Sequence, residues 1–202
     1  MTWVMFDYGG VISYPPGQQD LALLGRAADA AVPAFLEVYW HWRRAYDLAE
    51  LDASGYWRQV GHGLGREFSD AQVAELVRLD RVAWLHLRDG TVALIEDLAA
   101  AGQPLALLSN APDDLSRAIS DLPLAAHFGH LIFSSELKLA KPDPECYIRA
   151  LSILGASASD VIFIDDRSEN VVAADALGLR SVHFTSADEA RAAVAERLAD
   201  RV

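Results

Sequence analysis

The chain has a single cysteine, Cys146, among its 202 residues. One cysteine permits neither an intrachain disulfide nor a zinc site made of cysteines, and this favours a reducing compartment. No apolar run without charges reaches the length that spans a membrane, and the N-terminal residues have no basic lead of the kind that opens a secretion signal. We therefore expect a cytoplasmic protein that does not enter a membrane.

Basic residues are scarce in comparison with acidic ones. The chain has 17 Lys and Arg against 29 Asp and Glu, which gives a formal net charge of -12 at pH 7. Such a balance disfavours a surface that neutralises nucleic-acid phosphates or anionic lipid. A phosphorylated small molecule is compatible with it if a local cation offsets the phosphate charge. We therefore expect a small-molecule partner, no nucleic acid and no membrane, and a monomer or homodimer.

The rest of the composition is that of a folded protein with one large core. Hydrophobic residues make up 52% and charged residues 23% of the chain, which is typical of globular rather than disordered proteins. A length of 202 residues accommodates one substantial core and a modest insertion. Two large domains are therefore not expected.

The first predicted strand, residues 3–6, is apolar and ends abruptly in Asp7, soon followed by two adjacent glycines. Asp7 is therefore expected at the carboxyl end of a strand. Ligands bind at that edge in open α/β sheets, because several loops converge there outside the core. Val11 and Ile12, a few residues later, also have strand character.

Residues 18–85 consist of helix-forming sequence with little strand signal. Helices are expected over roughly 20–31, 33–50 and 54–64, and a fourth one from Ser69, where Gln72 completes the spacing of a capping box. We interpret this region as a helical insertion between the first strand and the rest of a sheet.

From Asp89 onward, predicted helices and strands alternate. The strands are expected over roughly 104–108, 131–133, 161–164 and 181–184. Helices are expected over 91–101 and 168–177, with one that begins at Pro112, one that ends near 154 and one that follows Ser186. Such alternation predicts an α/β fold: a doubly wound, Rossmann-like parallel sheet with helices on both faces. The chain thus divides into an α/β core, residues 1–16 and 87–202, and the helical insertion, residues 17–86.

Four predicted loops at the sheet edge carry polar side chains, in the order Asp7, Ser109 with Asn110, Lys141, and Asp165 with Asp166. The surrounding segments are FDYGGV, LLSNA, KLAKPDP and FIDDRSENVVAA. Together they resemble the haloacid dehalogenase-like (HAD) hydrolase superfamily, and the resemblance extends over essentially the whole chain. It implies a core of the HAD type, with the helical insertion as the small cap that follows the nucleophile loop. It also implies that Asp7 is the nucleophile and that the backbone carbonyl of Gly9 binds a metal.

The chemistry of these side chains suits the roles that the resemblance implies. A carboxylate such as Asp7 can attack a phosphoryl group and form an acyl-phosphate, which divides one displacement into two easier ones. Asp7, Asp165 and Asp166 offer oxygen ligands of the kind that Mg²⁺ prefers. Asn170 can orient one of these acids, and Lys141 adds a second positive charge.

Further residues are candidates for contact with the substrate. On the core these are Ser109, the backbone of Asn110, Gly10 and Lys141. On the insertion they are Arg43 and Arg44, which lie in a stretch rich in tyrosine and tryptophan.

Gly9 departs from the pattern of most phosphatases in the superfamily, which have a second Asp at this position as a general acid. General acid–base help is worth about 10²–10⁴-fold in rate, so its loss slows the reaction or restricts it to good leaving groups such as a sugar 1-phosphate. His41 or Tyr46 of the cap are candidates to replace the missing acid. One branch of the superfamily, which includes sugar-phosphate phosphatases, also has Asp-x-Gly at this place.

These observations predict an Mg²⁺-dependent phosphatase of small phosphorylated metabolites, of the sugar-phosphate type, that acts through an aspartyl-phosphate. One alternative is a hydrolytic dehalogenase of 2-haloacids, which uses the same attack without a metal. Those relatives have small neutral residues in place of the pair Asp165 and Asp166. A second alternative is a non-catalytic binding protein that kept the fold without the acid at position 9.

Overall fold

A computed structural model describes residues 1–200 of the protein. At its centre is a five-stranded parallel sheet in the order β3-β2-β1-β4-β5. The strands are β1 (Trp3–Phe6), β2 (Leu105–Ser109), β3 (His130–Phe133), β4 (Val161–Asp165) and β5 (Arg180–His183). Because β1 pairs with both β2 and β4, Asp7 leaves the sheet where the strand order reverses. The predicted doubly wound α/β fold is confirmed.

Helices connect and cover these strands. They are α1 (Gln18–Ala27), α2 (Val32–Asp47), α3 (Ala53–Gly63), α4 (Asp70–Ala83), α5 (Asp89–Ala100), α6 (Asp113–Ser120), α7 (Ser134–Leu137), α8 (Pro144–Leu154), α9 (Ser168–Ala176) and α10 (Ala187–Ala199), with the short 3-10 helices η1 (Pro123–His127) and η2 (Ala158–Asp160). The predicted cap at Ser69 is confirmed, because its hydroxyl accepts a hydrogen bond from the backbone N–H of Gln72. Pro112 caps α6 instead of starting it. The strand character assigned to Val11 and Ile12 is wrong: they lie in a turn, although both are buried.

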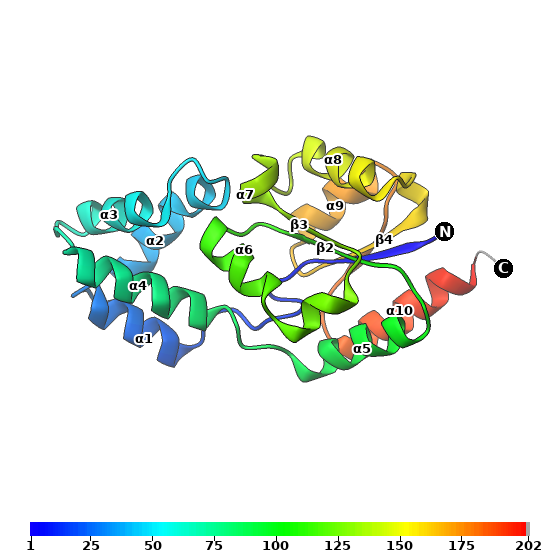
Figure 1. The fold of residues 1–202 in the computed structure, drawn as a ribbon, viewed down its shortest axis with the longest axis horizontal. Coiled ribbons are helices and arrows are strands. Elements are labelled where there is room, and N and C mark those ends of the chain that lie inside the picture. Colours follow the sequence, from blue (N-terminus) through cyan, green and yellow to red (C-terminus); the bar gives the residue numbers. More distant parts are fainter. Residues whose placement is uncertain (201–202) are drawn as a thin grey trace.

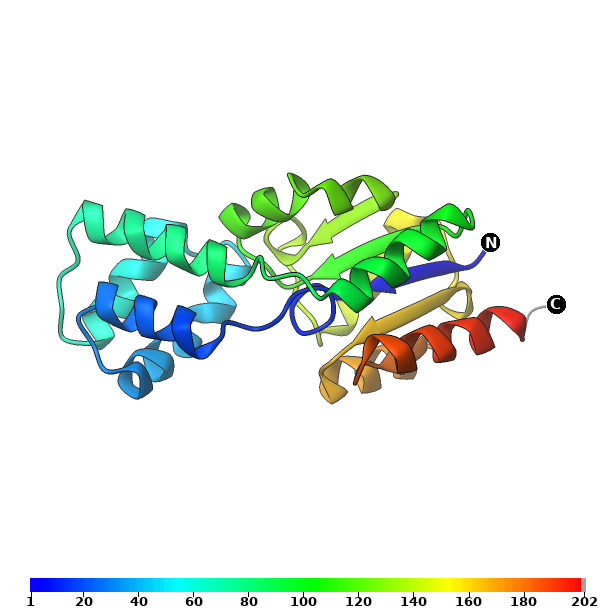
Figure 2. The same ribbon diagram turned by 90° about the horizontal axis from the view of Figure 1, so that it is seen from below.

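The two faces of the sheet have separate apolar layers. Val4 and Phe6 of β1 belong to one buried cluster, with side chains from α5, α6 and α10. Met5, between them in the sequence, belongs to the other cluster, with side chains from α8 and α9. Figures 1 and 2 show these helices on either side of the sheet. Strands that are apolar on both faces are what a doubly covered parallel sheet requires.

Helices α1–α4 form a bundle of their own beyond the carboxyl ends of the strands (Figures 1 and 2). Its core is rich in aromatic side chains, among them the buried Phe35, Tyr39 and Trp57. The bundle corresponds to the predicted insertion, and we call it the cap. The predicted boundaries, with the cap at residues 17–86, remain an interpretation, and residues 201–202 of the predicted core lie outside the described residues.

The carboxyl end of α2 is tied to the core by hydrogen bonds. Tyr46 Oη donates to Oδ1 of Asp114 on α6 at 2.6 Å. The Ser134 hydroxyl donates to the backbone carbonyl of Asp47 at 2.6 Å, and the same oxygen accepts from the backbone N–H of Ala111 at 3.0 Å. Because Ala111 lies in the loop after β2, these bonds hold the end of α2 over that loop.

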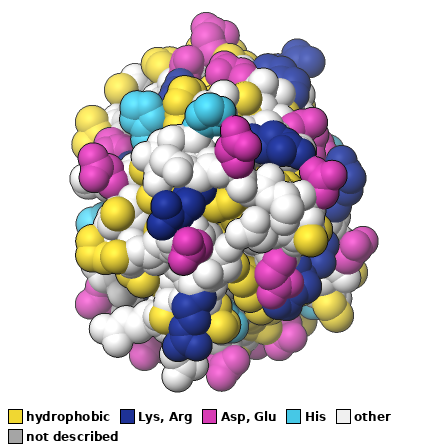
Figure 3. Space-filling view, turned by 90° about the vertical axis from the view of Figure 1, so that its left-hand side faces the viewer, with side chains coloured by type: hydrophobic (Ala, Val, Ile, Leu, Met, Phe, Trp, Pro, Cys, Tyr) yellow, Lys and Arg dark blue, Asp and Glu magenta, His cyan; other side chains and the backbone are white. Residues whose placement is uncertain are grey.

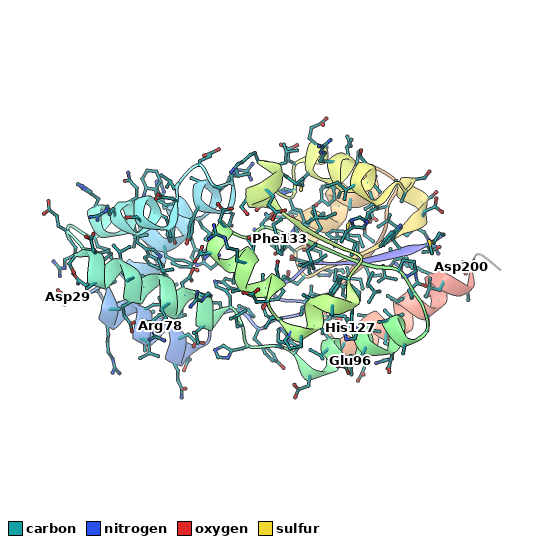
Figure 4. All side chains as sticks on the ribbon, in the orientation of Figure 1. Asp29, Arg78, Glu96, His127, Phe133 and Asp200 are labelled. Atoms are coloured by element: carbon teal, nitrogen blue, oxygen red, sulfur yellow. The ribbon has the colours of Figure 1, made fainter. Side chains whose placement is uncertain are left out.

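The surface of the molecule carries charges of both signs. On the end formed by the cap, acidic and basic side chains are interspersed (Figure 3). In Figure 4, Asp29 and Arg78 lie on the cap, whereas Phe133 marks the carboxyl end of β3. Within residues 1–200, no helix has both the length and the apolar character needed to cross a membrane.

Candidate active site

Two carboxylates from the ends of the central strands meet around one ammonium group. Lys141 Nζ lies 2.8 Å from Asp7 Oδ1 and 2.7 Å from Asp165 Oδ2. Asp7 follows β1, Asp165 ends β4, and Lys141 lies in the loop between α7 and α8. All three residues are buried. They are far apart in the sequence, so it is the parallel sheet that brings them together.

Asp165 is held by donors from the segment that follows it. The side-chain amide of Asn170 donates to both carboxylate oxygens, at 2.9 and 3.0 Å, and the backbone N–H of Arg167 donates to Oδ1 at 2.9 Å. Together with Lys141, these donors fix the carboxylate in one orientation. Asp165 is fully buried, whereas Asp166 is partly exposed.

Gly10 has a conformation and a closeness to its neighbours that disfavour any residue with a side chain. Its φ is +81°, and a Cβ on it would lie 2.2 Å from Oδ2 of Asp166. The sequence places Gly10 among the phosphate-binding residues, but its backbone N–H donates to the carbonyl of Ser13 at 2.9 Å. What Gly10 supplies is therefore room for the Asp166 carboxylate, and its amide is already used.

Asn110 and Lys141 are joined by a reciprocal pair of hydrogen bonds. Nδ2 of Asn110 donates to the carbonyl of Lys141, and the backbone N–H of Lys141 donates to Oδ1 of Asn110, both at 2.9 Å. The loop after β2 thus fixes the backbone that carries the lysine. The Asn110 side chain is occupied in this way, which leaves its backbone as the part that can meet a phosphate. Ser109, at the end of β2, is buried.

The charges in this cluster favour a divalent cation. Asp7, Asp165 and Asp166 can each offer one carboxylate oxygen, and these oxygens lie within 4.8 Å of one another. Burial raises the pKa of Asp7 to about 8; Lys141 opposes the rise, and the carboxylates of Asp165 and Asp166 add to it. A nucleophilic carboxylate has to be ionised, and one ammonium group is little positive charge for three carboxylates. An all-oxygen donor set of this kind fits Mg²⁺.

A cavity of about 440 Å³ lies between this edge of the sheet and the cap. From the core, its lining includes Asp7, Gly9, Gly10, Ser109, Asn110, Lys141, Asp166 and Asn170. From the cap, its lining includes Trp40, Arg43, Asp47 and Trp84. Residues from all four predicted strand-end loops therefore border one space, whose volume lies in the range of small-molecule sites.

The two arginines that the sequence offers as substrate contacts differ in position. Arg43 lines the cavity, but its guanidinium is buried and paired within the cap: Nε lies 2.8 Å from Asp47 Oδ1, and Nη1 lies 3.2 Å from Asp80 Oδ2. Arg44 is exposed and is not part of the cavity lining in the described chain. The structure does not bring Arg44 to the site, and it pairs the Arg43 guanidinium with the carboxylates of Asp47 and Asp80.

His41 and Tyr46, the two cap residues that the sequence offers as replacement acids, do not face the cavity as proton donors. His41 is exposed and does not belong to the cavity lining among residues 1–200. Tyr46 donates its hydroxyl proton to Asp114, and burial raises the pKa of that hydroxyl above its ordinary value. Neither residue is placed to protonate a leaving group.

Comparison with known proteins agrees with this geometry. The family model of the haloacid dehalogenase-like hydrolases matches residues 4–178. The chain belongs to this hydrolase family. It is 31% identical over 141 residues to the sesquiterpene phosphatase astK of Aspergillus oryzae, which is 69% of this chain and 70% of that protein. It is 32% identical over 124 residues to flavin mononucleotide hydrolase 1 of Arabidopsis thaliana, or 61% of this chain and 49%, about half, of that relative.

Solved structures of the family have the same fold. The HAD family enzyme bt-2542 of Bacteroides thetaiotaomicron, crystallised in complex with magnesium and inorganic phosphate, matches with a TM-score of 0.75. The match covers 92% of this chain and 94% of that chain at 18% identity. At this level of identity, the likeness establishes a shared architecture.

The cavity wall of this HAD-like hydrolase includes residues that the sequence does not single out. Asp47 follows Arg43 by four residues, so helical i,i+4 spacing is a signal that links this pair. The position of Trp84 has no such signal. A Cβ on Gly9 would lie 3.1 Å from Cζ3 of its indole, so an aromatic ring occupies the space beside this glycine.

Proposed function

We propose that this HAD-like hydrolase is an Mg²⁺-dependent phosphatase of small phosphorylated metabolites, of the sugar-phosphate type, and that it forms an aspartyl-phosphate on Asp7. The observation that carries the proposal is the buried ion pairing of Lys141 with Asp7 and Asp165, at 2.8 and 2.7 Å. Cations beside a carboxylate nucleophile offset its repulsion by an anionic phosphoryl group. The similarity to the sesquiterpene phosphatase astK supports the same class of reaction.

Each core residue has a proposed part in two successive displacements. Asp7 attacks the phosphorus atom, and the bond from phosphorus to the leaving oxygen breaks. Lys141 offsets charge on the transferred group, while the Ser109 hydroxyl and the backbone of Asn110 donate to its oxygens. Water then attacks the phosphorus of the aspartyl-phosphate, which releases inorganic phosphate and restores the Asp7 carboxylate.

The same cluster supplies the proposed ligands for the metal ion. Asp7, Asp165, Asp166 and the backbone carbonyl of Gly9 would hold Mg²⁺, and Asn170 keeps the Asp165 carboxylate in place. When bound, the ion supplies positive charge to the oxygens of the phosphoryl group during transfer.

The substrate class is proposed from the walls of the cavity. Trp40, which is 52% exposed, and Trp84 give the cap side an apolar, aromatic character. The apolar face of a ring can pack against indole, while polar groups at the cavity edge meet its substituents. We propose that the cap, a small helical cap of residues 17–86 inserted after the first strand, covers the substrate in this way and excludes water during transfer.

The test compares phosphate release from p-nitrophenyl phosphate with chloride release from 2-chloropropionate, each with Mg²⁺ and with EDTA. The proposal predicts phosphate release that EDTA abolishes and that is lost in Asp7→Asn, the control for contaminating phosphatase. Chloride release that persists in EDTA would identify a 2-haloacid dehalogenase instead. If neither product forms, and beryllofluoride with Mg²⁺ does not raise the melting temperature, the protein is a binding protein without catalysis. The cytoplasmic location and the monomeric or homodimeric state stay predictions.

A further inference from the structure

The leaving group of a phosphate ester needs a proton. An alkoxide or phenoxide is a poor leaving group unless a positioned acid protonates its oxygen during transfer. On the loop after the nucleophile, Gly9 and Gly10 have no side chain that can act in this way. The donor must therefore come from another part of the cavity wall.

The titratable side chains that line the cavity in the described chain are Asp7, Tyr8, Arg43, Asp47, Lys141, Asp166 and Arg167. Asp7 and Asp166 belong to the nucleophile and the proposed metal cluster. Lysine and arginine side chains are strong bases, which makes them poor proton donors. Burial raises the pKa of the Tyr8 hydroxyl, which makes it a weaker proton donor than an ordinary tyrosine. Asp47 is the carboxyl group that remains.

Asp47 is fixed at the cavity through both its backbone and its side chain. Its carbonyl accepts from the Ser134 hydroxyl at 2.6 Å, and the Ser134 oxygen accepts from the backbone N–H of Ala111 in the loop after β2. Its Oδ1 lies 2.8 Å from Nε of Arg43, and its side chain is 13% exposed. The backbone of Asp47 is therefore held over the loop after β2, and the residue lines the cavity with its side chain largely out of bulk solvent.

The surroundings of Asp47 also bring the pKa of its carboxyl group toward neutrality. Burial raises the pKa of Asp47 to about 6; Arg43 on its own helix opposes this rise, while Asp80 of α4 and Asp114 of α6 add to it. A general acid is most effective when its pKa lies near the working pH. This carboxyl group can therefore give up a proton in one step and take one back in the next.

We propose that the carboxyl group of Asp47 protonates the leaving-group oxygen as Asp7 attacks phosphorus, an inference that rests on the proposed phosphatase function. In the first step the bond from Asp7 to phosphorus forms and the ester P–O bond breaks, and the departing oxygen takes the proton of Asp47. In the second step water attacks phosphorus, its proton passes to the Asp47 carboxylate, and the bond to Asp7 breaks. Both residues then have their starting protonation states.

The test uses two esters of similar shape that differ in how much the leaving group needs a proton. The value of kcat/KM is measured with Mg²⁺ for phenyl phosphate and for p-nitrophenyl phosphate. Asp47→Asn removes the acidic proton but keeps an acceptor for Arg43. Asp80→Asn is the matched control, because Asp80 also binds Arg43 but does not belong to the cavity lining among the described residues.

We expect Asp47→Asn to lower kcat/KM for phenyl phosphate by about 10²-fold or more. The loss for p-nitrophenyl phosphate should be smaller than the loss for phenyl phosphate by a factor of at least about ten. Asp80→Asn should lower both values by one common factor. Asp47→Glu, which keeps a carboxyl group, should recover activity on phenyl phosphate relative to Asp47→Asn.

Three outcomes separate this inference from the function on which it rests. Equal losses on both esters in Asp47→Asn, as in the control, would overturn the role of Asp47 while the phosphatase function stands. If Asp47→Asn does not fold, Asp47→Glu is the deciding variant. Its carboxyl group is displaced, so kcat/KM should fall more for phenyl phosphate than for p-nitrophenyl phosphate. An equal fall for the two esters overturns the role of Asp47. If the wild-type protein releases no phosphate from either ester, the proposed phosphatase function itself is contradicted.

Discussion

The replacement of Gly10 by alanine tests how closely the two acidic loops pack. An alanine meets two obstacles here: the φ of +81°, and a Cβ position that is 2.2 Å from Oδ2 and 2.4 Å from Cγ of Asp166. A positive φ costs a non-glycine residue about 1–2 kcal/mol, and forcing an extra atom into a packed site costs about 1–3 kcal/mol more. We therefore expect Gly10→Ala to lower the free energy of unfolding by about 2–5 kcal/mol.

Gly65→Ala is the matched control, because Gly65 has a φ of +67° but nothing within 4 Å of its Cβ position. Urea titrations should give a loss of about 1–2 kcal/mol for this variant, from the backbone alone. Gly10→Ala should also move the Asp166 carboxylate and so reduce the rise in melting temperature with Mg²⁺, which Gly65→Ala should retain. Equal unfolding free energies and an equal response to Mg²⁺ in the two variants would refute the reasoning.

Three further substitutions test other contacts. Lys141→Met leaves two buried carboxylates without their ammonium group, so in EDTA it should lower the free energy of unfolding by about 3–5 kcal/mol; a urea titration without loss contradicts this. The pKa of Asp47 is raised from 3.8 to about 6 in the folded state, so the folded state holds this proton more tightly, and the stability that it contributes is lost as the pH rises from about 4 to 6. Urea titrations across this window should therefore show a fall in stability that is smaller by about 2–3 kcal/mol in Asp47→Asn than in the wild type; an unchanged slope counts against the shift. Gly9→Ala should cost about 1 kcal/mol because of the Trp84 indole, and less in a Trp84→Leu background; strict additivity in this double-mutant cycle would show that the two residues do not touch.

The sequence predicts the fold well because its strongest local signals agree with the final packing. The strand over residues 161–164 is apolar throughout, which is what a sheet covered on both faces needs. The αL cap at Gly155 and the capping box at Ser69 place helix ends from a few residues alone. The segment around Val11 is the counterexample: its apolar residues are buried in the core, but the chain turns there, and local pattern does not distinguish a buried turn from a short strand.

The core half of the site is predictable for a different reason. In a parallel sheet the carboxyl ends of all strands lie at one edge, so polar residues that follow strands meet there whatever their separation in sequence. Lys141 and Asp165 illustrate this, because they are 24 residues apart and only 2.7 Å separates their charged atoms.

The cap half of the site depends on how helices pack, and the sequence contains little of that information. The pairing of Arg43 with Asp80 joins α2 to α4, and the contact of Trp84 with Gly9 joins the cap to the core. Protonation states cannot be predicted from the sequence either, because burial in the fold is the largest influence on the pKa of Asp47. For these reasons Arg44 looks as promising in the sequence as Arg43 does, and the sequence does not single out Asp47.

The most direct measurement asks which residue carries the phosphoryl group during turnover. The protein is mixed with p-nitrophenyl phosphate and Mg²⁺, quenched, reduced with borohydride and analysed by peptide mass spectrometry, with an EDTA sample in parallel. Borohydride converts an acyl-phosphate of aspartate to homoserine, so we predict this mass change at Asp7, only in the sample with substrate and Mg²⁺. Phosphate release with an unchanged Asp7 peptide, or with the modification on another residue, would contradict the assignment of Asp7 as the nucleophile.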